Sequence, residues 1–278
     1  MARLAGIEVA GVSIAGLETA IDVPEWKLCF DLGRAQYFAL ARALILFTHP
    51  HMDHLGGVAW HCATRALRGM PEPTYVVGRE HAGLLRELFE VWRRLDGSEL
   101  PHRLVELGPG EEFALGNQRF ARPFRTLHRV RSQGYVLFER RHKLRAEFAA
   151  LPGAEIARRR AAGAAAELFE TLEVPELAFS GDTRIEAIER EPAACRARVL
   201  VLECTFVDER VSVEETRAMG HVHLDEIAAR AELFENEALL LTHFSERYTE
   251  AEIMAALNAK LPPALRARVT PLLTGRRD

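Results

Sequence analysis

The segment 48–57 constrains this chain of 278 residues more than any other, because it reads Thr-His-Pro-His-Met-Asp-His-Leu-Gly-Gly and continues an apolar run. Four potential metal ligands, His49, His51, Asp53 and His54, fall within six residues. Imidazole and carboxylate together suit zinc, and also manganese or iron. A tight loop after a rigid strand can aim the first two histidines at one ion, while Asp53 and His54 face a second. The two glycines would let the chain turn into a helix without a Cβ clash.

Short apolar runs alternate with longer amphipathic stretches along the chain, which predicts a layered α/β architecture. We expect strands near residues 27–33, 43–48, 74–77, 120–126, 134–139, 176–180, 198–203 and 238–242, and helices over 54–68, 79–95, 223–235 and 249–260. The one compositional break is a basic, alanine-rich segment with helical composition. We therefore expect a single domain over 1–278 with a short basic arm-like insertion at about 140–170.

Composition limits the cellular compartment and the binding surfaces that we expect for the chain. About half of the residues are apolar, and no run of 18 or more apolar residues exists, so we expect no membrane span. The first residues lack the apolar core of a signal peptide, and four cysteines occur without a C-x-x-C pair, so we expect a cytoplasmic protein with reduced thiols. The formal net charge of −4 means that any nucleic-acid binding must use a local basic patch.

Further potential ligands follow other predicted strands. They are His128, the Asp182 of Ser-Gly-Asp-Thr, and the His243 of Leu-Thr-His-Phe. Taken singly, His128 or His243 could be an ordinary surface histidine. In this order behind the His-x-His-x-Asp-His motif, they resemble the ligand pattern of the metallo-β-lactamase superfamily.

The resemblance implies a fold and a metal centre. The fold is an α/β sandwich of the αββα type, with two mixed sheets flanked by helices. The implied centre holds two zinc ions, with His49, His51 and His128 on one, Asp53, His54 and His243 on the other, and Asp182 bridging them. Two such ions roughly 3.5–4 Å apart can activate a hydroxide near neutral pH and stabilise a phosphoryl or acyl group under attack. Asp53 would orient the nucleophile or accept its proton.

Three further features resemble one branch of the superfamily, RNase Z, and look closest to the short tRNase Z proteins of the plant type. The segment 202–206 carries a Glu-x-Thr-Phe element, His221 lies 22 residues before His243, and 242–248 reads Thr-His-Phe-Ser-Glu-Arg-Tyr. The resemblance implies an endoribonuclease that cuts the 3′ trailer from precursor tRNA and leaves a 3′ hydroxyl on the tRNA. It also implies a homodimer.

The same resemblance assigns roles near the metals. His221 would give a proton to the departing 3′ oxygen, and Glu203 would orient His221 and keep it protonated. Ser245, Arg247 and Tyr248 would bind substrate, with the arginine contacting a phosphate. A structural salt bridge between Glu203 and His221 is the alternative interpretation. His223 is a competing candidate for the catalytic role, although a position at a helix start suits it better.

Two other functions stay open at this point. A small-molecule metallo-hydrolase, acting on phosphodiesters, thioesters or lactones, would use the same metals with different surroundings. An RNA-binding protein without turnover is the other, and the full ligand set argues against it. The long arm with a Gly-Pro-rich tip found in many RNase Z enzymes is not evident in 140–170. That segment would supply the local basic surface, or it is a solvated pair of helices.

Overall fold

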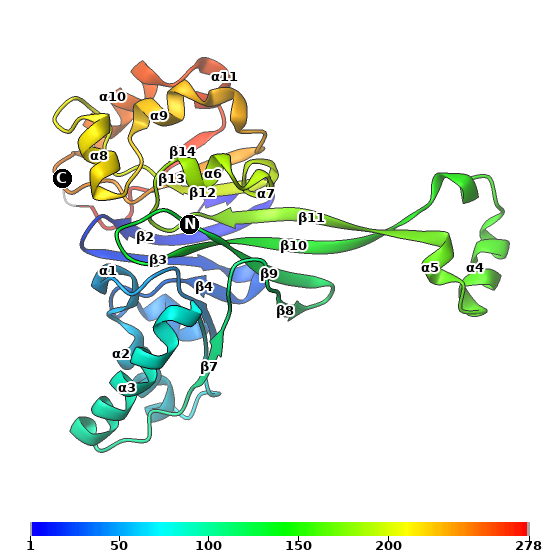
Figure 1. The fold of residues 1–278 in the computed structure, drawn as a ribbon, viewed down its shortest axis with the longest axis horizontal. Coiled ribbons are helices and arrows are strands. Elements are labelled where there is room, and N and C mark those ends of the chain that lie inside the picture. Colours follow the sequence, from blue (N-terminus) through cyan, green and yellow to red (C-terminus); the bar gives the residue numbers. More distant parts are fainter. Residues whose placement is uncertain (1, 277–278) are drawn as a thin grey trace.

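The computed structural model describes residues 2–276 and consists of two packed β-sheets with helices on their outer faces (Figure 1). Each sheet has seven strands, and strand order follows chain order in both. The first sheet is built by residues 2–106 and the second by residues 113–271. The expected αββα sandwich of two mixed sheets is confirmed.

The first sheet begins as an antiparallel meander and becomes parallel at its fourth strand. Its strands are β1 Ala2–Leu4, β2 Ile7–Ile14, β3 Glu18–Val23, β4 Leu28–Phe30, β5 Leu44–Leu46, β6 Thr74–Val77 and β7 Arg103–Glu106. The strand expected at 43–48 ends at Leu46, and the next residues run as an extended loop into His49. The meander over the first 23 residues was not among the expected strands.

The second sheet repeats this change of direction in its own half of the chain. Its strands are β8 Phe113–Gly116, β9 Arg119–Arg125, β10 Gln133–Leu144, β11 Phe169–Phe179, β12 Val199–Glu203, β13 Ala238–Thr242 and β14 Val269–Pro271. All residues of β12 and β13 are buried, as expected for parallel strands covered on both faces.

Helices cover the outer face of each sheet. They are α1 Met52–Leu55, α2 Val58–Leu67 and α3 Arg79–Asp96 on the first sheet, and α6 Glu186–Glu189, α7 Pro192–Arg196, α8 Val213–Met219, α9 Leu224–Ala229, α10 Glu250–Lys260 and α11 Pro263–Arg266 on the second. The helix expected over 54–68 is divided by Gly56 and Gly57. A Cβ at Gly57 would lie 2.5 Å from the carbonyl oxygen of Arg34, so glycine is needed there for close approach of two backbone segments. No helix within the described residues is both long and apolar enough to span a membrane.

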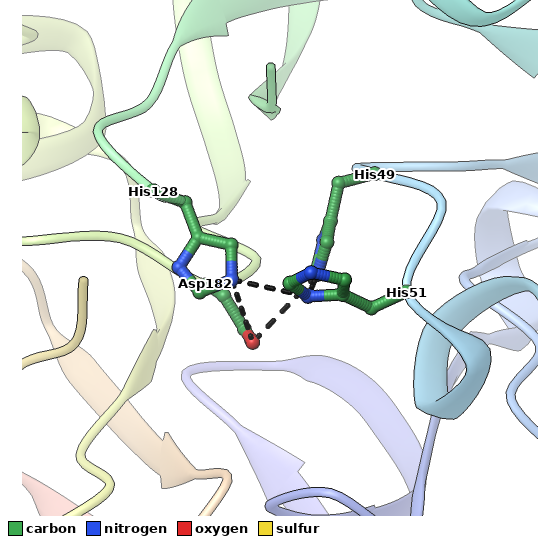
Figure 2. Close-up of side chains that lie close together, drawn as sticks. All are labelled: His49, His51, His128 and Asp182. Atoms are coloured by element: carbon green, nitrogen blue, oxygen red, sulfur yellow. Dashed lines mark hydrogen bonds and ion pairs between the residues drawn. The ribbon is translucent and has the colours of Figure 1, made fainter. Parts of the chain in front are cut away.

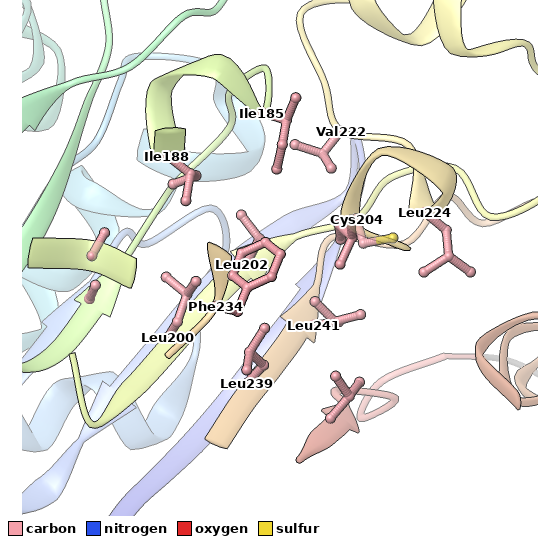
Figure 3. Packing of buried hydrophobic residues seen from close by; sticks show 14 of the residues in the cluster. Ile185, Ile188, Leu200, Leu202, Cys204, Val222, Leu224, Phe234, Leu239 and Leu241 are labelled. Carbon is pink, nitrogen blue, oxygen red and sulfur yellow. The ribbon is translucent and has the colours of Figure 1, made fainter. Parts of the chain in front are cut away.

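The core has three layers. Between the sheets, aromatic rings of Phe30 and Phe179 pack with centroids 4.9 Å apart. A second cluster lies under α2 and α3. The third lies between the second sheet and its helices, where Leu200, Leu239 and Phe234 meet (Figure 3). This apolar packing fixes the strand ends that carry the potential ligands.

Strands β10 and β11 continue beyond the sheet as a two-stranded ribbon, which carries α4 Gly153–Ala161 and α5 Ala165–Leu168 at its far end (Figure 1). The pairing runs out to Leu144 opposite Phe169. The helical expectation for 140–170 is therefore wrong for its first residues, where cross-strand ion pairs such as Arg140–Glu173 favour the ribbon. We call residues 140–173 the arm.

Candidate metal centre

All seven predicted ligands converge on one site, at the ends of strands from both sheets. One group follows β5 in the loop before α1 and in α1 itself, and comprises His49, His51, Asp53 and His54. His128 follows β9, Asp182 follows β11, and His243 follows β13 in the second sheet. Figure 2 shows four of these side chains pointing toward one another.

Four of these side chains form one candidate site, which we call site A. Nε2 of His49 and Nε2 of His128 lie 3.0 Å and 3.2 Å from Nδ1 of His51. Oδ2 of Asp182 lies 3.7 Å from His49 and 3.8 Å from His128. Three imidazole nitrogens and one carboxylate oxygen around a common centre fit a divalent transition-metal ion.

The other oxygen of Asp182 belongs to a second group, site B. Oδ1 lies 3.2 Å from Nε2 of His54 and 3.4 Å from Nε2 of His243. Oδ2 of Asp53 completes the group at 3.7 Å and 3.6 Å from the same two nitrogens. Asp182 therefore presents one oxygen to each site.

Buried polar atoms without partners make this arrangement able to accept cations. Nε2 of His54, Nε2 of His243 and Oδ1 of Asp182 are buried and form no hydrogen bond, although they face one another. Such orphaned groups are costly in a folded protein unless an ion satisfies them. His243 also holds a left-handed backbone conformation with φ of 61°, a strain typical of functional positions. The residues thus fit a two-metal centre.

Two buried carboxylates, Asp31 and Glu203, orient the candidate histidine ligands in parallel ways. Asp31 accepts a hydrogen bond from Nδ1 of His54 at 2.7 Å and one from the Thr48 hydroxyl at 2.8 Å, while Nδ1 of His49 donates to that hydroxyl at 3.0 Å. His243 has the same kind of partner, since its Nδ1 donates to the hydroxyl of Thr205 at 3.0 Å.

Glu203 accepts a hydrogen bond from Thr205 in the same way that Asp31 accepts one from Thr48. The Thr205 hydroxyl donates to Oε2 of Glu203 at 2.6 Å. His128 is held differently, because its Nδ1 donates to the carbonyl oxygen of Gly220 at 2.8 Å. Such partners fix the tautomer and direction of a ligating imidazole. The sequence did not reveal this role of Asp31, an acidic residue that directly follows the buried strand β4.

Charges divide the histidines into two classes. Burial lowers the pKa of His49, His51 and His128, so these three histidines of site A are neutral at pH 7. Burial acts the same way on His54, but the carboxylates of Asp182 and Asp31 outweigh it and hold the His54 pKa well above its ordinary value. Burial alone would raise the pKa of Asp53, but the hydrogen bond with His243 and the charges of His243 and His54 outweigh it and lower the pKa to about 2.

His221 lies beside the metal ligands without belonging to either group of four. Its ring stacks on His243 with centroids 5.4 Å apart and lies 5.0 Å from the ring of His128. Nδ1 of His221 lies 3.0 Å from Oε1 of Glu203. Burial lowers the pKa of His221, but the Glu203 carboxylate raises it to about 9. His223 instead caps helix α9, where its side chain accepts from the backbone of Asp225.

The three predicted substrate residues differ in their exposure. Arg247 is exposed, its Nε donates to the Ser245 hydroxyl at 3.1 Å, and its guanidinium lies over the ring of Phe206. Tyr248 is only 2% exposed, and its hydroxyl bonds to Asp208 within the protein. The structure therefore brings Arg247 and Ser245 to the surface and places Tyr248 in the core.

The fold and this ligand set define the class of the protein. Residues 40–244 match the model of the β-lactamase superfamily domain, and the chain belongs to that superfamily. The fold also resembles solved metallo-β-lactamase-fold structures. The Bacillus subtilis protein YhfI matches with a TM-score of 0.64 at 14% identity, and each chain is covered to 96%.

Sequence comparison places the chain within one branch. It is 42% identical to the Arabidopsis thaliana protein tRNase Z TRZ1, with 98% of this chain and 97% of the relative covered. It is 38% identical to the chloroplastic tRNase Z TRZ2 of the same plant, with 99% and 78% covered. The human short form of tRNase Z shares the fold with a TM-score of 0.62 at 19% identity, and 96% of each chain is covered. The chain belongs to the tRNase Z family.

Proposed function

We propose that this protein is a metal-dependent endoribonuclease that removes the 3′ trailer from tRNA precursors. The observation that carries the proposal is the Glu203–His221 pair beside a complete two-metal ligand set. A hydrolase of small thioesters or lactones has less need for a protonated histidine there. Family membership supports the same substrate, because the most similar relatives carry the name tRNase Z.

The proposed centre holds two zinc ions, and manganese or iron are alternative ions for the same imidazole and carboxylate ligands. When bound, the ions supply an activated water and offset negative charge on the phosphate. Asp53 is ionised, because its pKa is about 2, and Oδ2 also accepts the backbone N–H of Gly16 at 2.9 Å. Its carboxylate is thus fixed in position to orient the attacking water or to take its proton.

The proposed cut breaks the bond between phosphorus and the 3′ oxygen of the tRNA. An oxygen from water bonds to the phosphorus as this bond breaks, so the tRNA keeps a 3′ hydroxyl and the trailer carries a 5′ phosphate. The departing oxygen needs a proton, and His221 holds one at neutral pH. Because Nδ1 of His221 faces Glu203, the other ring nitrogen is the one available to the leaving group.

Substrate contacts extend this proposal outward. Arg247 is free to meet a phosphate, and Ser245 positions its guanidinium. Tyr248 supports the loop from the core through its bond to Asp208. The arm gives the enzyme reach toward parts of tRNA far from the cut. Several of its arginines are paired with glutamates, as Arg158 is with Glu155, so its basic surface rests on fewer residues than the sequence indicates.

We also propose that the enzyme is a homodimer joined through α3. This helix exposes an apolar stripe of Leu84, Leu88, Val91 and Leu95, of which Leu84 is 70% and Leu95 79% exposed. Their spacing places them on one side of the helix. An exposed apolar stripe of this kind is removed from contact with water when it packs against a partner surface.

The charges beside the stripe favour a second copy of the same helix. Glu87 and Arg94 lie on one flank in opposite halves of α3, both exposed and neither in an ion pair among residues 2–276. When two α3 helices pack antiparallel about a twofold axis, Glu87 of one copy faces Arg94 of the other at both ends. The stripe is thus self-complementary.

The proposed reaction is tested by incubating zinc-loaded protein with a precursor tRNA, a chromogenic phosphodiester and a glutathione thioester. We expect a cut directly after the discriminator nucleotide, mapped by sequencing of the product ends. Cleavage of the thioester alone would replace the nuclease by a small-molecule hydrolase. Tight metal uptake without cleavage of any ester would support an RNA-binding role.

A further inference from the structure

A hollow of about 540 Å³ lies directly beside the metal centre and is dominated by positive charge. Its walls come from the loop between β9 and β10, the residue after Thr183, and the end of α8. Its lining, over the part of the chain that the structure describes, has no acidic residue and five arginines: Arg125, Arg129, Arg131, Arg184 and Arg217. We call it the arginine hollow. Its volume is in the range of pockets that hold small ligands.

The charges of three of these arginines are not balanced by an acidic partner within residues 2–276. Within residues 2–276, Arg129, Arg131 and Arg184 form no ion pair. Arg217 differs, because it bonds to Glu226 at 2.6 Å, and Arg125 lies 3.9 Å from Glu80. Uncompensated cations held close together repel one another, so an anion from outside would stabilise the arrangement.

The backbone around the hollow is held rigidly. The Leu127 N–H donates to the Thr183 hydroxyl at 3.0 Å, and the Arg184 N–H donates to the Leu127 carbonyl at 2.9 Å. The Gln133 N–H donates to the Thr48 carbonyl at 3.0 Å. The loop is therefore tied to the loops that carry the metal ligands. A fixed backbone of this kind presents its arginines before the ligand arrives, which lowers the entropic cost of binding.

The position of the hollow tells which part of the substrate it meets. His128, a site A ligand, and Gly220 form part of its wall. Gly220 directly precedes His221, so the hollow adjoins the side of the centre where the leaving oxygen receives its proton. That oxygen is the 3′ oxygen of the tRNA, and the strand on the 5′ side of the cut leads away from it.

We propose that the arginine hollow binds backbone phosphates of the tRNA strand on the 5′ side of the cut. This inference rests on the proposed function, since it requires an RNA substrate. Arg129, Arg131 and Arg184 supply the contacts, and phosphate matches the planar guanidinium fork. Arginines that contact phosphates contribute affinity and register but no base preference. The hollow thus fixes which phosphate reaches the metals.

The test uses tRNA that lacks a trailer, so that only the 5′ side of the cut is present. Its Kd is measured over a range of KCl concentrations for the wild type, for each single Arg→Ala variant, and for the variant with Arg129, Arg131 and Arg184 all replaced. The dependence of log Kd on log salt should fall by roughly 0.7 to 0.9 for each lost phosphate contact. The triple variant should bind roughly tenfold or more weakly at 0.15 M salt. Arg103→Ala removes an exposed arginine on β7 that forms no ion pair with any residue between 2 and 276, and this variant should bind as the wild type does.

The outcomes separate the two proposals. Metal content and thermal unfolding of the triple variant are measured first, so that a loss of fold is recognised. A 5′-phosphorylated trailer oligonucleotide is the second ligand. The proposed role of the hollow is overturned if the triple variant binds tRNA with the Kd and the salt dependence of the wild type. It is also overturned if the variant loses affinity only for the trailer oligonucleotide. A wild-type protein that neither binds nor cleaves precursor tRNA overturns the proposed function instead.

Discussion

Nδ1 of His221 lies 3.0 Å from Oε1 of Glu203, and this contact leaves the opposite ring nitrogen free at the metal centre. His221→Ala removes the proposed proton donor and leaves all seven candidate metal ligands in the chain. We expect both metals to remain while cleavage of precursor tRNA slows roughly 10²–10⁴-fold. His223→Ala is the matched control, because it removes a nearby buried histidine that bonds to Asp225 and Asp208 and leaves the candidate ligands and His221 in place. Full activity of the His221 variant in single-turnover assays would refute the assigned role.

Asp182 offers one oxygen to each candidate site. In Asp182→Ala both sites lose a ligand, so metal content measured by mass spectrometry should fall and cleavage should be abolished. The fold should persist by circular dichroism, because the surrounding strands are held by apolar packing. Asp182→Asn keeps the shape and loses the charge, and it should show the same direction of effect. Undiminished metal content in both variants would rule out a bridging role.

Asp31 accepts a hydrogen bond from His54 and belongs to neither candidate group of metal ligands. Asp31→Asn should therefore weaken metal binding roughly 10- to 100-fold, the usual effect of losing a ligand's orienting partner. Competition with a chelator measures the affinity. Asp96→Asn, the same change at an exposed position on α3, serves as control. Equal affinity of the two variants would show that Asp31 is not needed to orient His54.

The raised pKa of His54 predicts a proton linkage. In the metal-free protein His54 is protonated at pH 7, whereas the histidines of site A are neutral. A metal entering site B must displace about one proton, so its affinity should rise as the pH rises through the neutral range. Calorimetry in buffers with different ionisation enthalpies measures the release. Binding heats that do not depend on the buffer would contradict the linkage.

The charges on the flank of α3 allow a test of the proposed dimer. Glu87→Arg places arginines opposite Arg94 of the second copy, which should shift the protein toward monomers in light scattering. The double change Glu87→Arg with Arg94→Glu restores opposite charges and should restore the dimer. Monomeric wild-type protein, or a single variant that dimerises as well as the wild type, would dismiss this interface.

The sequence predicted well the strand ends that carry the candidate ligands. The apolar runs of β5 and β13 lead directly toward His49 and His243, so a local pattern located each ligand. Other features depend on residues that are far apart in the chain. Asp31 acts on His54 across 23 positions, and the ribbon of the arm depends on pairs such as Arg140–Glu173. The β1–β3 meander follows from pairing with β4, which the strongly apolar segments alone do not reveal.

The ligands of each candidate site come from both sheets: the loop after β5 lies on one, and His128, Asp182 and His243 lie on the other. A bound cation therefore acts as a crosslink between the N-terminal and C-terminal halves of the chain. Ions that bind only the assembled halves stabilise the native state by mass action. Depletion of metal would then weaken the seam between the halves, while the apolar packing around the strands would keep the fold itself.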